Sequence, residues 1–600
     1  MKNRREIHFS ITQETPCFTL LCQRNEVGRE AAIKAAQTMA ENAGSHYGSL
    51  GTFGGDNELG WAIRIPKQSS PLTGWSYHVT PDELCFVEGD FYEDPVGSQT
   101  TSGEITGLSE YVAEELATTA NGRIRGLIGV WSAVHVDRRS NKITVVNDLT
   151  GTRPVFWYGN DDVFIVTHSL WAFRQCSWIR PEWDAMALNQ RLTIGVPLQG
   201  RTWLKGVRIL TRGQRLVSDD HGTGVRDERQ HFDRPEATSE DCVERLRFAI
   251  DQLTDSVSRR VGSGLLLGLS GGLDSRILLA SLVSQGIDVS AITYAASEQE
   301  RDAQLAERCA RHCGISHHLA LLDGQVAKDL IPDCLILNNG ESRAYGHAML
   351  GQQAQSHGGD ALLLGYAGDL FAGHPIGNFD FHKVRTVEEL SKKMLQAYHT
   401  WMTADEVRLI LPPGLRVEWE EFMAEWNASF SGSHDSLQDL FIDHVLDNRV
   451  QRRTLPRLDQ SRPWCVPIMA FVDERVYSAY RTLPLSEIVE EKAHLSLIRD
   501  YQSGLENIPS AAKAFLGLPL KYEYRARQGI KLLRSLRTAK QFARRLLVKP
   551  TRRDLPKATH NMFDDLGIHG LYDRAGMQAL HEAPTRGCSR LRRSCNNFAA

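Results

Sequence analysis

Hydrophobic and polar residues follow two different patterns along the chain. Up to about residue 235, apolar and polar residues alternate in short runs that Asn, Asp and Gly separate. Such alternation is typical of strands in antiparallel sheets. The clearest runs are residues 84–92, 128–136, 142–149 and 162–170.

A second pattern begins after the polar stretch 222–241, which predicts a loop. Apolar residues recur at helical spacing over 239–260 and predict a long amphipathic helix. Strands and helices then alternate, which predicts a doubly wound parallel sheet. The expected strands are 263–269, 288–295, 317–322 and 360–366, the expected helices begin at Arg276 and near residue 300, and the pattern beyond 380 is mostly helical.

Residues 265–280 (LLLGLSGGLDSRILLA) contain the most informative motif. A buried strand leads into a glycine turn and then into the first turn of a helix, where free N–H groups can bind an anion. Ser270 and Ser275 add hydroxyl donors. Asp274 would repel a phosphate unless a divalent cation bridges the two. The motif therefore predicts a pyrophosphate and Mg²⁺ site, but it lacks the lysine of the GxxxxGK[ST] loop.

A second buried strand ends in residues 365–369 (GYAGD), which carry one carboxylate. Ligands of parallel sheets bind at the carboxyl ends of the strands, where both loops are expected. Asp274 and Asp369 can then hold Mg²⁺ against a pyrophosphate leaving group. By itself, the second motif fits a turn with an aspartate helix cap equally well.

Composition narrows the class of protein. The 600 residues are 42% hydrophobic, enough for two or more globular domains, and the net charge of −4 gives no general argument for nucleic-acid binding. No signal-peptide pattern and no apolar span of membrane length occurs, and the 11 cysteines form no CxxC pair. We expect a cytoplasmic protein without a transmembrane segment.

The chain resembles the asparagine synthetase-like superfamily in several segments. The strongest are residues 270–275 (SGGLDS), which look like the PP-loop of ATP pyrophosphatases, together with 294–318 and 365–369. Residues 447–473 are similar to the family's helix and loop with a V-P-F-L-D-like end. Weaker similarities lie at 87–92 (VEGDFY) and 148–156 (DLTGTRPVF).

The resemblance implies a fold, two domains and two cofactors. It implies an N-terminal αββα, Ntn-hydrolase-like sandwich over 1–235, related to glutamine amidotransferases. Residues 236–600 would form a doubly wound parallel-sheet ATP-pyrophosphatase domain with a helical C-terminal part. ATP and Mg²⁺ are the implied cofactors, with Asp274 and Asp369 as metal ligands. The expected nucleotide-binding residues are Leu269, Ser270, Gly271, Gly272, Leu273, Asp274, Ser275, Tyr294 and Gly365.

Two departures concern the N-terminal domain. Glutamine-hydrolysing members have a nucleophilic cysteine directly after the initiator methionine, whereas this chain has Lys2, and Cys17 and Cys22 are internal. Glu88 stands where the family has an asparagine that binds the glutamine amide, and an ionised carboxylate cannot donate to an amide carbonyl. We therefore expect that this domain does not hydrolyse glutamine.

Tyr366 is a third departure. Glutamine-dependent asparagine synthetases usually have a glutamate in this loop, whereas the β-lactam and carbapenam synthetase branch has a tyrosine that acts with a glutamate as catalytic base. Lasso-peptide cyclases use the same chemistry on a peptide. The resemblance thus implies a catalytic role for Tyr366, although a packing tyrosine is the alternative. Candidates for the partner glutamate are Glu388, Glu389 and Glu406.

The family also has a lysine beside the acyl-adenylate, where it neutralises developing charge. Lys513 fits this position best, and Lys521 is second. Residues 525–553 carry many lysines and arginines and no acidic residue. This basic segment could dock an acidic substrate, partner or membrane, but a solvated helix is the simpler interpretation.

These residues together predict an ATP-dependent carbon–nitrogen ligase that adenylates a carboxylate and forms an amide or lactam in specialised metabolism. An asparagine synthetase that uses ammonia or glutamine is the alternative, and a silent scaffold or a PP-loop tRNA-modifying enzyme represents other classes. The expected partners are a small-molecule or peptide carboxylate and an amine. Nucleic acid is not expected, and the resemblance is compatible with a homodimer.

Overall fold

The computed structural model describes most of the chain between residues 15 and 510. Short gaps interrupt this range. The gaps are 24–28, 44–46, 48, 57, 67–69, 98–102, 119–123, 174–181, 229–238, 323, 343–345, 372–383, 399–401, 432–435, 489–490 and 502.

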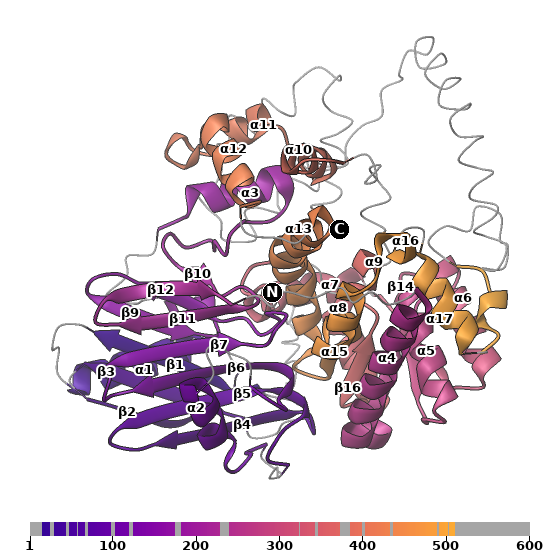
Figure 1. Ribbon diagram of the computed structural model, residues 1–600, viewed down its shortest axis with the longest axis horizontal. Helices are drawn as coiled ribbons and strands as arrows, with labels where there is room; N and C mark the ends of the chain where they lie inside the picture. The colour runs from indigo at the N-terminus through magenta and orange to yellow at the C-terminus, as the bar shows by residue number, and fades with distance from the viewer. Residues whose placement is uncertain are drawn as a thin grey trace, which may run out of the picture.

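The N-terminal half contains two six-stranded antiparallel sheets, seen at the left of Figure 1. One sheet has the order β10-β8-β9-β1-β3-β2. It comprises β1 (Cys17–Gln23), β2 (Ser49–Gly55), β3 (Leu59–Ile65), β8 (Phe156–Gly159), β9 (Val163–Thr167) and β10 (Arg208–Ile209). The other has the order β12-β11-β7-β6-β5-β4. It comprises β4 (Thr73–Val79), β5 (Glu83–Glu93), β6 (Ile128–Asp137), β7 (Lys142–Asn147), β11 (Gln214–Asp219) and β12 (Gly222–Asp227).

Alternation along the strands assigns side chains to two hydrophobic layers. Phe18 in β1 and Phe86 in β5 belong to the core between the sheets. Cys17 and Leu21 point the other way and pack with α1 (Arg29–Asn42). Val87 likewise packs with α2 (Leu108–Thr118) on the outer face of the second sheet. The helix–sheet–sheet–helix order confirms the predicted αββα sandwich.

The C-terminal half is built on a five-stranded parallel sheet with the order β15-β14-β13-β16-β17. Its strands are β13 (Leu265–Gly268), β14 (Ser290–Ala295), β15 (His317–Leu321), β16 (Ala361–Leu364) and β17 (Val466–Met469). Helices among them are α4 (Ser239–Val261), α5 (Asp274–Ser284), α6 (Arg301–Cys313), α7 (Gly324–Leu337), α8 (Gly346–Ser356) and α9 (Gly368–Phe371). This arrangement confirms the predicted parallel sheet.

Three elements differ from expectation. Residues Gly222–Asp227, expected to be part of a loop, form the edge strand β12, which is mostly exposed and therefore lacks the buried apolar positions that mark a strand in the sequence. Helix α5 begins at Asp274, not at Arg276, so the aspartate belongs to its first turn. Strand β17 lies in the region expected to be mostly helical and pairs with β16. Its sequence, VPIM, is a four-residue run that is buried throughout, and such a run shows no alternation from which a strand could be recognised.

One of the remaining helices belongs to the N-terminal half, and the others lie between β16 and β17 or after β17 in the sequence. They are α3 (Ala185–Ile194), α10 (Val387–Tyr398), α11 (Ala404–Ile410), α12 (Trp419–Ala428), α13 (Leu437–His444), the π-helix η6 (Val445–Thr454), α14 (Leu455–Leu458), α15 (Glu474–Arg481), α16 (Leu485–Ile488) and α17 (Lys492–Asp500). Short 3-10 turns are η1 (Leu170–Phe173), η2 (Gly262–Gly264), η5 (Pro413–Leu415), η7 (Asp459–Ser461), η8 (Ala470–Val472) and η10 (Leu505–Asn507).

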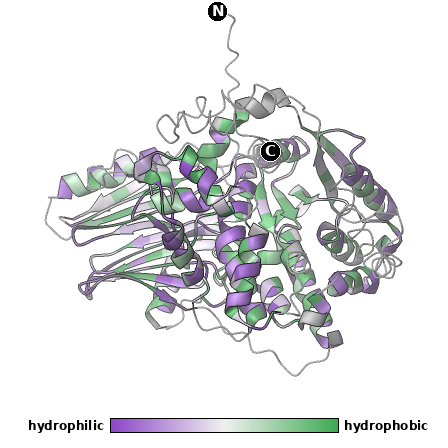
Figure 2. Cartoon of the chain, turned by 90° about the horizontal axis from the view of Figure 1, so that it is seen from above, coloured by the Kyte–Doolittle hydropathy of each residue, from purple (hydrophilic) through white to green (hydrophobic). Residues whose placement is uncertain are grey.

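Hydrophobic residues concentrate on the inner strands, and hydrophilic residues lie on the outward faces of the helices (Figure 2). Among the helices that the structure describes between residues 15 and 510, none is long and apolar enough to cross a membrane.

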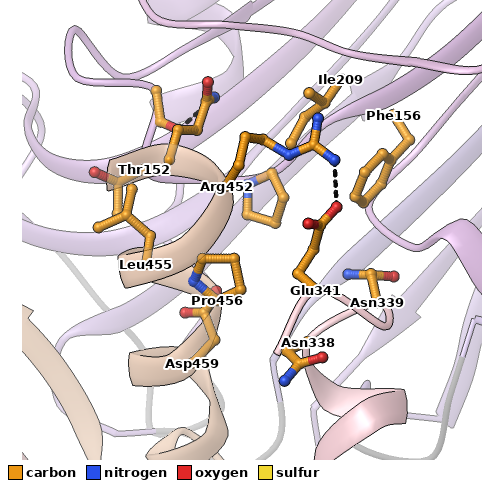
Figure 3. Close-up of a pocket in the computed structure, with 13 residues that line it drawn as sticks. Thr152, Phe156, Ile209, Asn338, Asn339, Glu341, Arg452, Leu455, Pro456 and Asp459 are labelled. Atoms are coloured by element: carbon orange, nitrogen blue, oxygen red, sulfur yellow. Dashed lines mark hydrogen bonds and ion pairs between the residues drawn. The ribbon is translucent and has the colours of Figure 1, made fainter. Parts of the chain in front are cut away.

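Helix η6 joins the two halves through polar contacts. Gln451 donates to the carbonyls of Gly151 (2.9 Å) and Leu210 (3.0 Å) in the N-terminal half. Arg452 forms an ion pair with Glu341 beside a cavity of about 20 Å³ (Figure 3). The halves are therefore tied together by buried hydrogen bonds and charges, and the boundary near residue 235 stays a prediction.

Candidate functional site

The loop between β13 and α5 is closed by its own side chains. The Ser270 amide donates to Ser275 Oγ (3.0 Å), and the Gly272 amide donates to Ser270 Oγ (3.2 Å). Leu269 precedes this turn as a buried residue, and its carbonyl accepts from Thr293 Oγ1 at 2.6 Å. The serines thus hold the glycine turn directly before the N-terminus of α5, where backbone N–H groups favour an anion.

Arg276 anchors this loop to the last described segment. Its guanidinium is fully buried and donates to the carbonyl of Gly271 at 3.2 Å. It also donates to the carbonyls of Leu505 (3.1 Å), Ile508 (2.7 Å) and Pro509 (2.9 Å). Pro509, four residues before Lys513, is therefore attached to the phosphate-type loop, although Lys513, Lys521 and the segment 525–553 lie outside the described residues.

Asp302 is a site residue that the sequence did not single out. Its Oδ1 accepts from the Gly271 amide at 3.0 Å, so this amide already binds an anionic oxygen. Burial raises the pKa of Asp302, while this hydrogen bond opposes the rise. In the sequence, Asp302 could have been noticed as an acidic residue in the first turn of α6, just after the carboxyl end of β14.

The second predicted loop packs directly against Asp274. A Cβ added at Gly368 would lie 2.5 Å from Asp274 Cγ, and one added at Gly365 would lie 2.7 Å from the Ser275 nitrogen. Both glycines are therefore required for close approach. Asp369 follows Gly368 in α9, but its side chain is not among those described. The two loops lie together, as the sequence predicted.

Asp274 is also held from the far end of the chain. His494 Nε2 lies 3.2 Å from Asp274 Oδ1, and the hydroxyl of Tyr480 lies 3.2 Å from the same nitrogen. The Asp274 side chain remains 25% exposed, whereas His494 is buried. This arrangement orients one carboxylate oxygen and leaves the group accessible.

Tyr366 points into a cluster with a histidine and a second tyrosine. Its hydroxyl lies 2.6 Å from His347 Nε2 and 3.1 Å from the hydroxyl of Tyr294. The ring of His347 makes edge contacts with both tyrosines. Predicted residues Tyr294 and Tyr366 are therefore in contact, and His347 is a partner that the sequence did not reveal.

Burial controls protonation in this cluster. It lowers the pKa of His347 to about 3, so the imidazole is neutral near pH 7, and Arg457 adds to the effect. Burial also raises the pKa of Tyr366 well above its usual value, with Tyr294 as a further cause. Two neutral groups thus share a short hydrogen bond in which either can be the donor.

The glutamates proposed as partners of Tyr366 have other local roles. Glu388 and Glu389 are exposed in the first turn of α10, and Glu389 accepts from the Arg385 amide at 2.8 Å. Glu406 closes a capping box with Thr403 at the start of α11. Within the described residues, the groups bonded to the Tyr366 hydroxyl are His347 and Tyr294.

Glu88 lies in a fully buried charge network. Arg153 donates to it through Nη2 (2.6 Å) and Nε (2.7 Å), His168 Nε2 lies 3.1 Å away, and Ser132 Oγ donates at 2.7 Å. Although burial alone would raise it, Arg153 and His168 lower the pKa of Glu88 to about 2. The position at which the resemblance implies an amide-binding asparagine is thus a closed ion pair.

The nearest internal thiol is equally inaccessible. Cys17 begins β1 and is fully buried, and burial raises the pKa of its thiol to about 12. A protonated, buried thiol is a poor nucleophile.

Solved structures with similarity to the chain have low identity and low TM-scores. Glutamine phosphoribosylpyrophosphate amidotransferase from B. subtilis is 10% identical, with 50% of this chain and 90% of that chain covered and a TM-score of 0.23. NMN synthetase from Francisella tularensis is 18% identical, with 36% and 97% covered and a TM-score of 0.20. Glutamine-dependent NAD+ synthetase from Acinetobacter baumannii is 12% identical, with 39% and 53% covered and a TM-score of 0.18. At these scores the similarities carry no argument about function.

A comparison with curated proteins finds no match. A family model does match, and the matched region runs from α4 to α17 and includes both loops, Asp274, Tyr366 and His494. This match supports the general prediction of an ATP-dependent, amide-forming ligase. Residues 249–499 match the model of the family described as asparagine synthase.

Proposed function

We propose that this protein adenylates a substrate carboxylate with ATP and then joins the acyl group to an amine, releasing pyrophosphate and AMP. The observation that carries the proposal is the contact of residues 270–275 with residues 365–369 around the accessible carboxylate of Asp274. The N-terminus of α5, directly after the first loop, offers backbone N–H groups for phosphate oxygens, and the second loop carries Tyr366.

Asp274 fits a magnesium ligand. Asp274 exposes a carboxylate, the ligand type that Mg²⁺ prefers, and within the described residues its Oδ2 accepts no hydrogen bond from the protein. Asp274 would hold the ion, with Asp369 as the expected second ligand. Bound Mg²⁺ would neutralise charge on the pyrophosphate leaving group.

The Tyr366 cluster supports a role in the amine step. Neutral His347 can fix the orientation of the Tyr366 hydroxyl, which then presents an oxygen that can accept from an amine N–H. Lys513 is proposed to stabilise the negative charge that develops during acyl transfer, since the segment ending at Ser510 is attached to the nucleotide loop.

The N-terminal half supports a reaction without glutamine hydrolysis. The carboxylate of Glu88 already forms an ion pair with Arg153, and the thiol of Cys17 is buried and protonated. We therefore propose that the amine is free ammonia or belongs to a substrate. An amide- or lactam-forming enzyme of specialised metabolism is the preferred assignment.

The family match favours one other candidate, an asparagine synthetase that converts aspartate with ammonia. Substrate screening separates the two. Aspartate would be the acid that supports adenylation in that case, whereas other acids would do so in the preferred assignment.

The decisive experiment is ATP–pyrophosphate exchange with a panel of amino acids and other carboxylic acids. We expect one acid to give exchange in the wild type and Asp274→Asn to abolish it. Asp255→Asn, an exposed carboxylate on α4, is the matched control and should retain exchange. Release of ADP in place of AMP would refute adenylation. Release of glutamate from glutamine would refute the assignment of the N-terminal half.

A further inference from the structure

Many buried or half-buried arginines in the described part of the chain have a carboxylate partner. The pairs are Arg153 with Glu88, Arg201 with Asp184 and Glu425, Arg212 with Asp443 and Asp447, Arg452 with Glu341, Arg462 with Asp90, Arg475 with Asp473, and Arg481 with Asp439 and Asp443. Arg276 and Arg191 instead donate to backbone carbonyls. This pattern is expected, because a guanidinium removed from water needs hydrogen-bond acceptors or a counter-charge within the protein.

Arg457 departs from this pattern. It lies at the end of α14 and is half-buried, and its Nε donates to the hydroxyl of Ser342 at 3.2 Å. Among the described residues, no carboxylate forms an ion pair with it and neither Nη group has a hydrogen-bond partner. Burial lowers the pKa of Arg457, and Arg449 contributes to the lowering.

The surroundings of Arg457 belong to the candidate site. Helix α14, which carries Arg457, packs on α8, the helix of His347. The positive charge of Arg457 partly opposes the rise that burial causes in the pKa of Tyr366, and it adds to the lowering of the pKa of His347. His347 is 5% exposed, and its Nδ1 has no hydrogen-bond partner in the described part of the chain. The guanidinium of Arg457 and the unpaired, buried Nδ1 of His347 thus lie near Tyr366. The proposed function places this tyrosine at the amine step.

We propose that Arg457 binds a carboxylate of the acid substrate beside Tyr366. This proposal rests on the proposed function and adds a residue that recognises the substrate class. A guanidinium holds a carboxylate through two parallel N–H···O bonds, and its Nη groups are the ones without a protein acceptor. The competing anion is the nucleotide phosphate. We favour the carboxylate because α14, which carries Arg457, packs on α8, whose His347 contacts the Tyr366 hydroxyl. In the loop of Tyr366, by contrast, Gly365 and Gly368 are the residues packed on 274–275.

The first test needs binding only. Phenylglyoxal reacts with accessible guanidinium groups, and peptide mapping reports how far Arg457 is modified. We expect succinate or L-aspartate to protect Arg457 and their amides, succinamide and L-asparagine, to protect it poorly. Protection by Mg-ATP with no protection by any carboxylate would assign Arg457 to the nucleotide and overturn the proposal.

The second test uses the acid that supports pyrophosphate exchange. Arg457→Gln should raise KM for this acid about 10- to 100-fold, since a charge-assisted pair is lost, and change KM for ATP less than about twofold. Arg457→Lys should restore part of the affinity. Arg259→Gln, an exposed arginine on α4, is the control. An unchanged KM for the acid in folded Arg457→Gln would overturn the proposal.

The two proposals fail in different ways. If no acid gives exchange in the wild type, the proposed function fails, while protection of Arg457 by carboxylates still supports an acid-binding residue. If exchange occurs and Arg457→Gln leaves it unaltered, the ligase assignment stands and the role of Arg457 fails. Unfolding midpoints of both variants separate lost binding from lost folding.

Discussion

Ionisable side chains are buried in both halves of the protein, but they are compensated differently. Glu88 in the N-terminal sandwich is surrounded by Arg153, His168 and Ser132, and none of the four exposes more than a small fraction of its surface. In the parallel-sheet half, Asp274 is partly exposed, and Arg457 lacks a carboxylate partner within the described residues. One site is closed on itself, whereas the other leaves charge for a ligand.

The difference shows how a structural site can be distinguished from a binding site. In a complete buried network, every charge and hydrogen-bonding group has its partner within the network. Removing one of these groups leaves the others buried without a partner. An incomplete network costs stability unless something else binds to it. By this criterion, the network around Glu88 supports the fold, and the two loops of the parallel sheet are the place to search for substrate.

Replacement of Glu88 tests the closed network and has the largest expected effect. Glu88→Gln leaves Arg153 buried without its counter-charge, so we expect the free energy of unfolding to fall by about 3–5 kcal/mol near pH 7. Urea unfolding measures this loss. Pyrophosphate exchange per folded molecule should be unchanged.

The pH dependence sharpens this test. Because the folded-state pKa of Glu88 is lowered from 4.5 to about 2, its stabilisation is present above pH 4.5 and is lost as the pH falls toward 2. The difference between wild type and Glu88→Gln should shrink over that range. Glu114→Gln, an exposed residue on α2, should change little. A loss of less than about 1 kcal/mol for Glu88→Gln would contradict the assignment of a closed network.

Gly368→Ala tests the open site. The added methyl group would clash with the Asp274 side chain, so Asp274 or the loop that carries Gly368 must shift. We expect pyrophosphate exchange to fall about 10- to 100-fold, because a displaced catalytic group is costly. Gly414→Ala, where an added Cβ meets nothing within 4 Å, is the control. Full activity in Gly368→Ala would mean that the contact with Asp274 is not needed.

Titration of His347 provides a smaller effect in the same site. Its folded-state pKa is lowered from 6.5 to about 3, so the unfolded state binds a proton that the folded state does not. Stability should therefore be complete above pH 6.5 and fall by about 1–2 kcal/mol between pH 6.5 and about pH 5. His347→Gln should remove this part of the pH dependence, whereas exposed His221→Gln should preserve it. Identical pH profiles for wild type and His347→Gln would refute the buried neutral histidine.

The sequence was informative where local pattern and local chemistry coincide. Alternation predicted antiparallel sheets, and the family resemblance implied the αββα sandwich. Buried strands followed by glycine turns predicted the parallel sheet and the adjacent loops at 270–275 and 365–369. The short buried strand β17 was missed because its four residues show no periodicity. The separate roles of Asp274 and Tyr366 were inferred from residue type and resemblance.

Site residues supplied by distant elements could not be found in this way. His494 reaches Asp274 from α17, His347 reaches Tyr366 from α8, and Arg457 follows a π-helix. Each is an ordinary helical residue in its own segment. Its role depends on a partner brought near by the fold, and a single sequence contains no sign of that pairing.

The smallest expected effect concerns Ala367, which adopts a left-handed conformation (φ 68°) between Tyr366 and Gly368. This conformation costs an L-residue about 1–2 kcal/mol, and part of that cost is offset by the greater flexibility of glycine in the unfolded chain. Ala367→Gly should therefore raise the free energy of unfolding by about 0.5–1 kcal/mol, measured by urea unfolding. In the exposed helical position Ala424 the same change should instead lower it by about 1 kcal/mol.

Activity shows whether the strain in Ala367 has a function. If the left-handed residue fixes the Tyr366 hydroxyl against His347, Ala367→Gly will be more stable and a few-fold slower in amine-dependent AMP formation, because a flexible loop holds the hydroxyl less firmly. A variant that is both more stable and equally active would show that this strain is unrelated to catalysis. The open site would then depend on its glycines and charges alone.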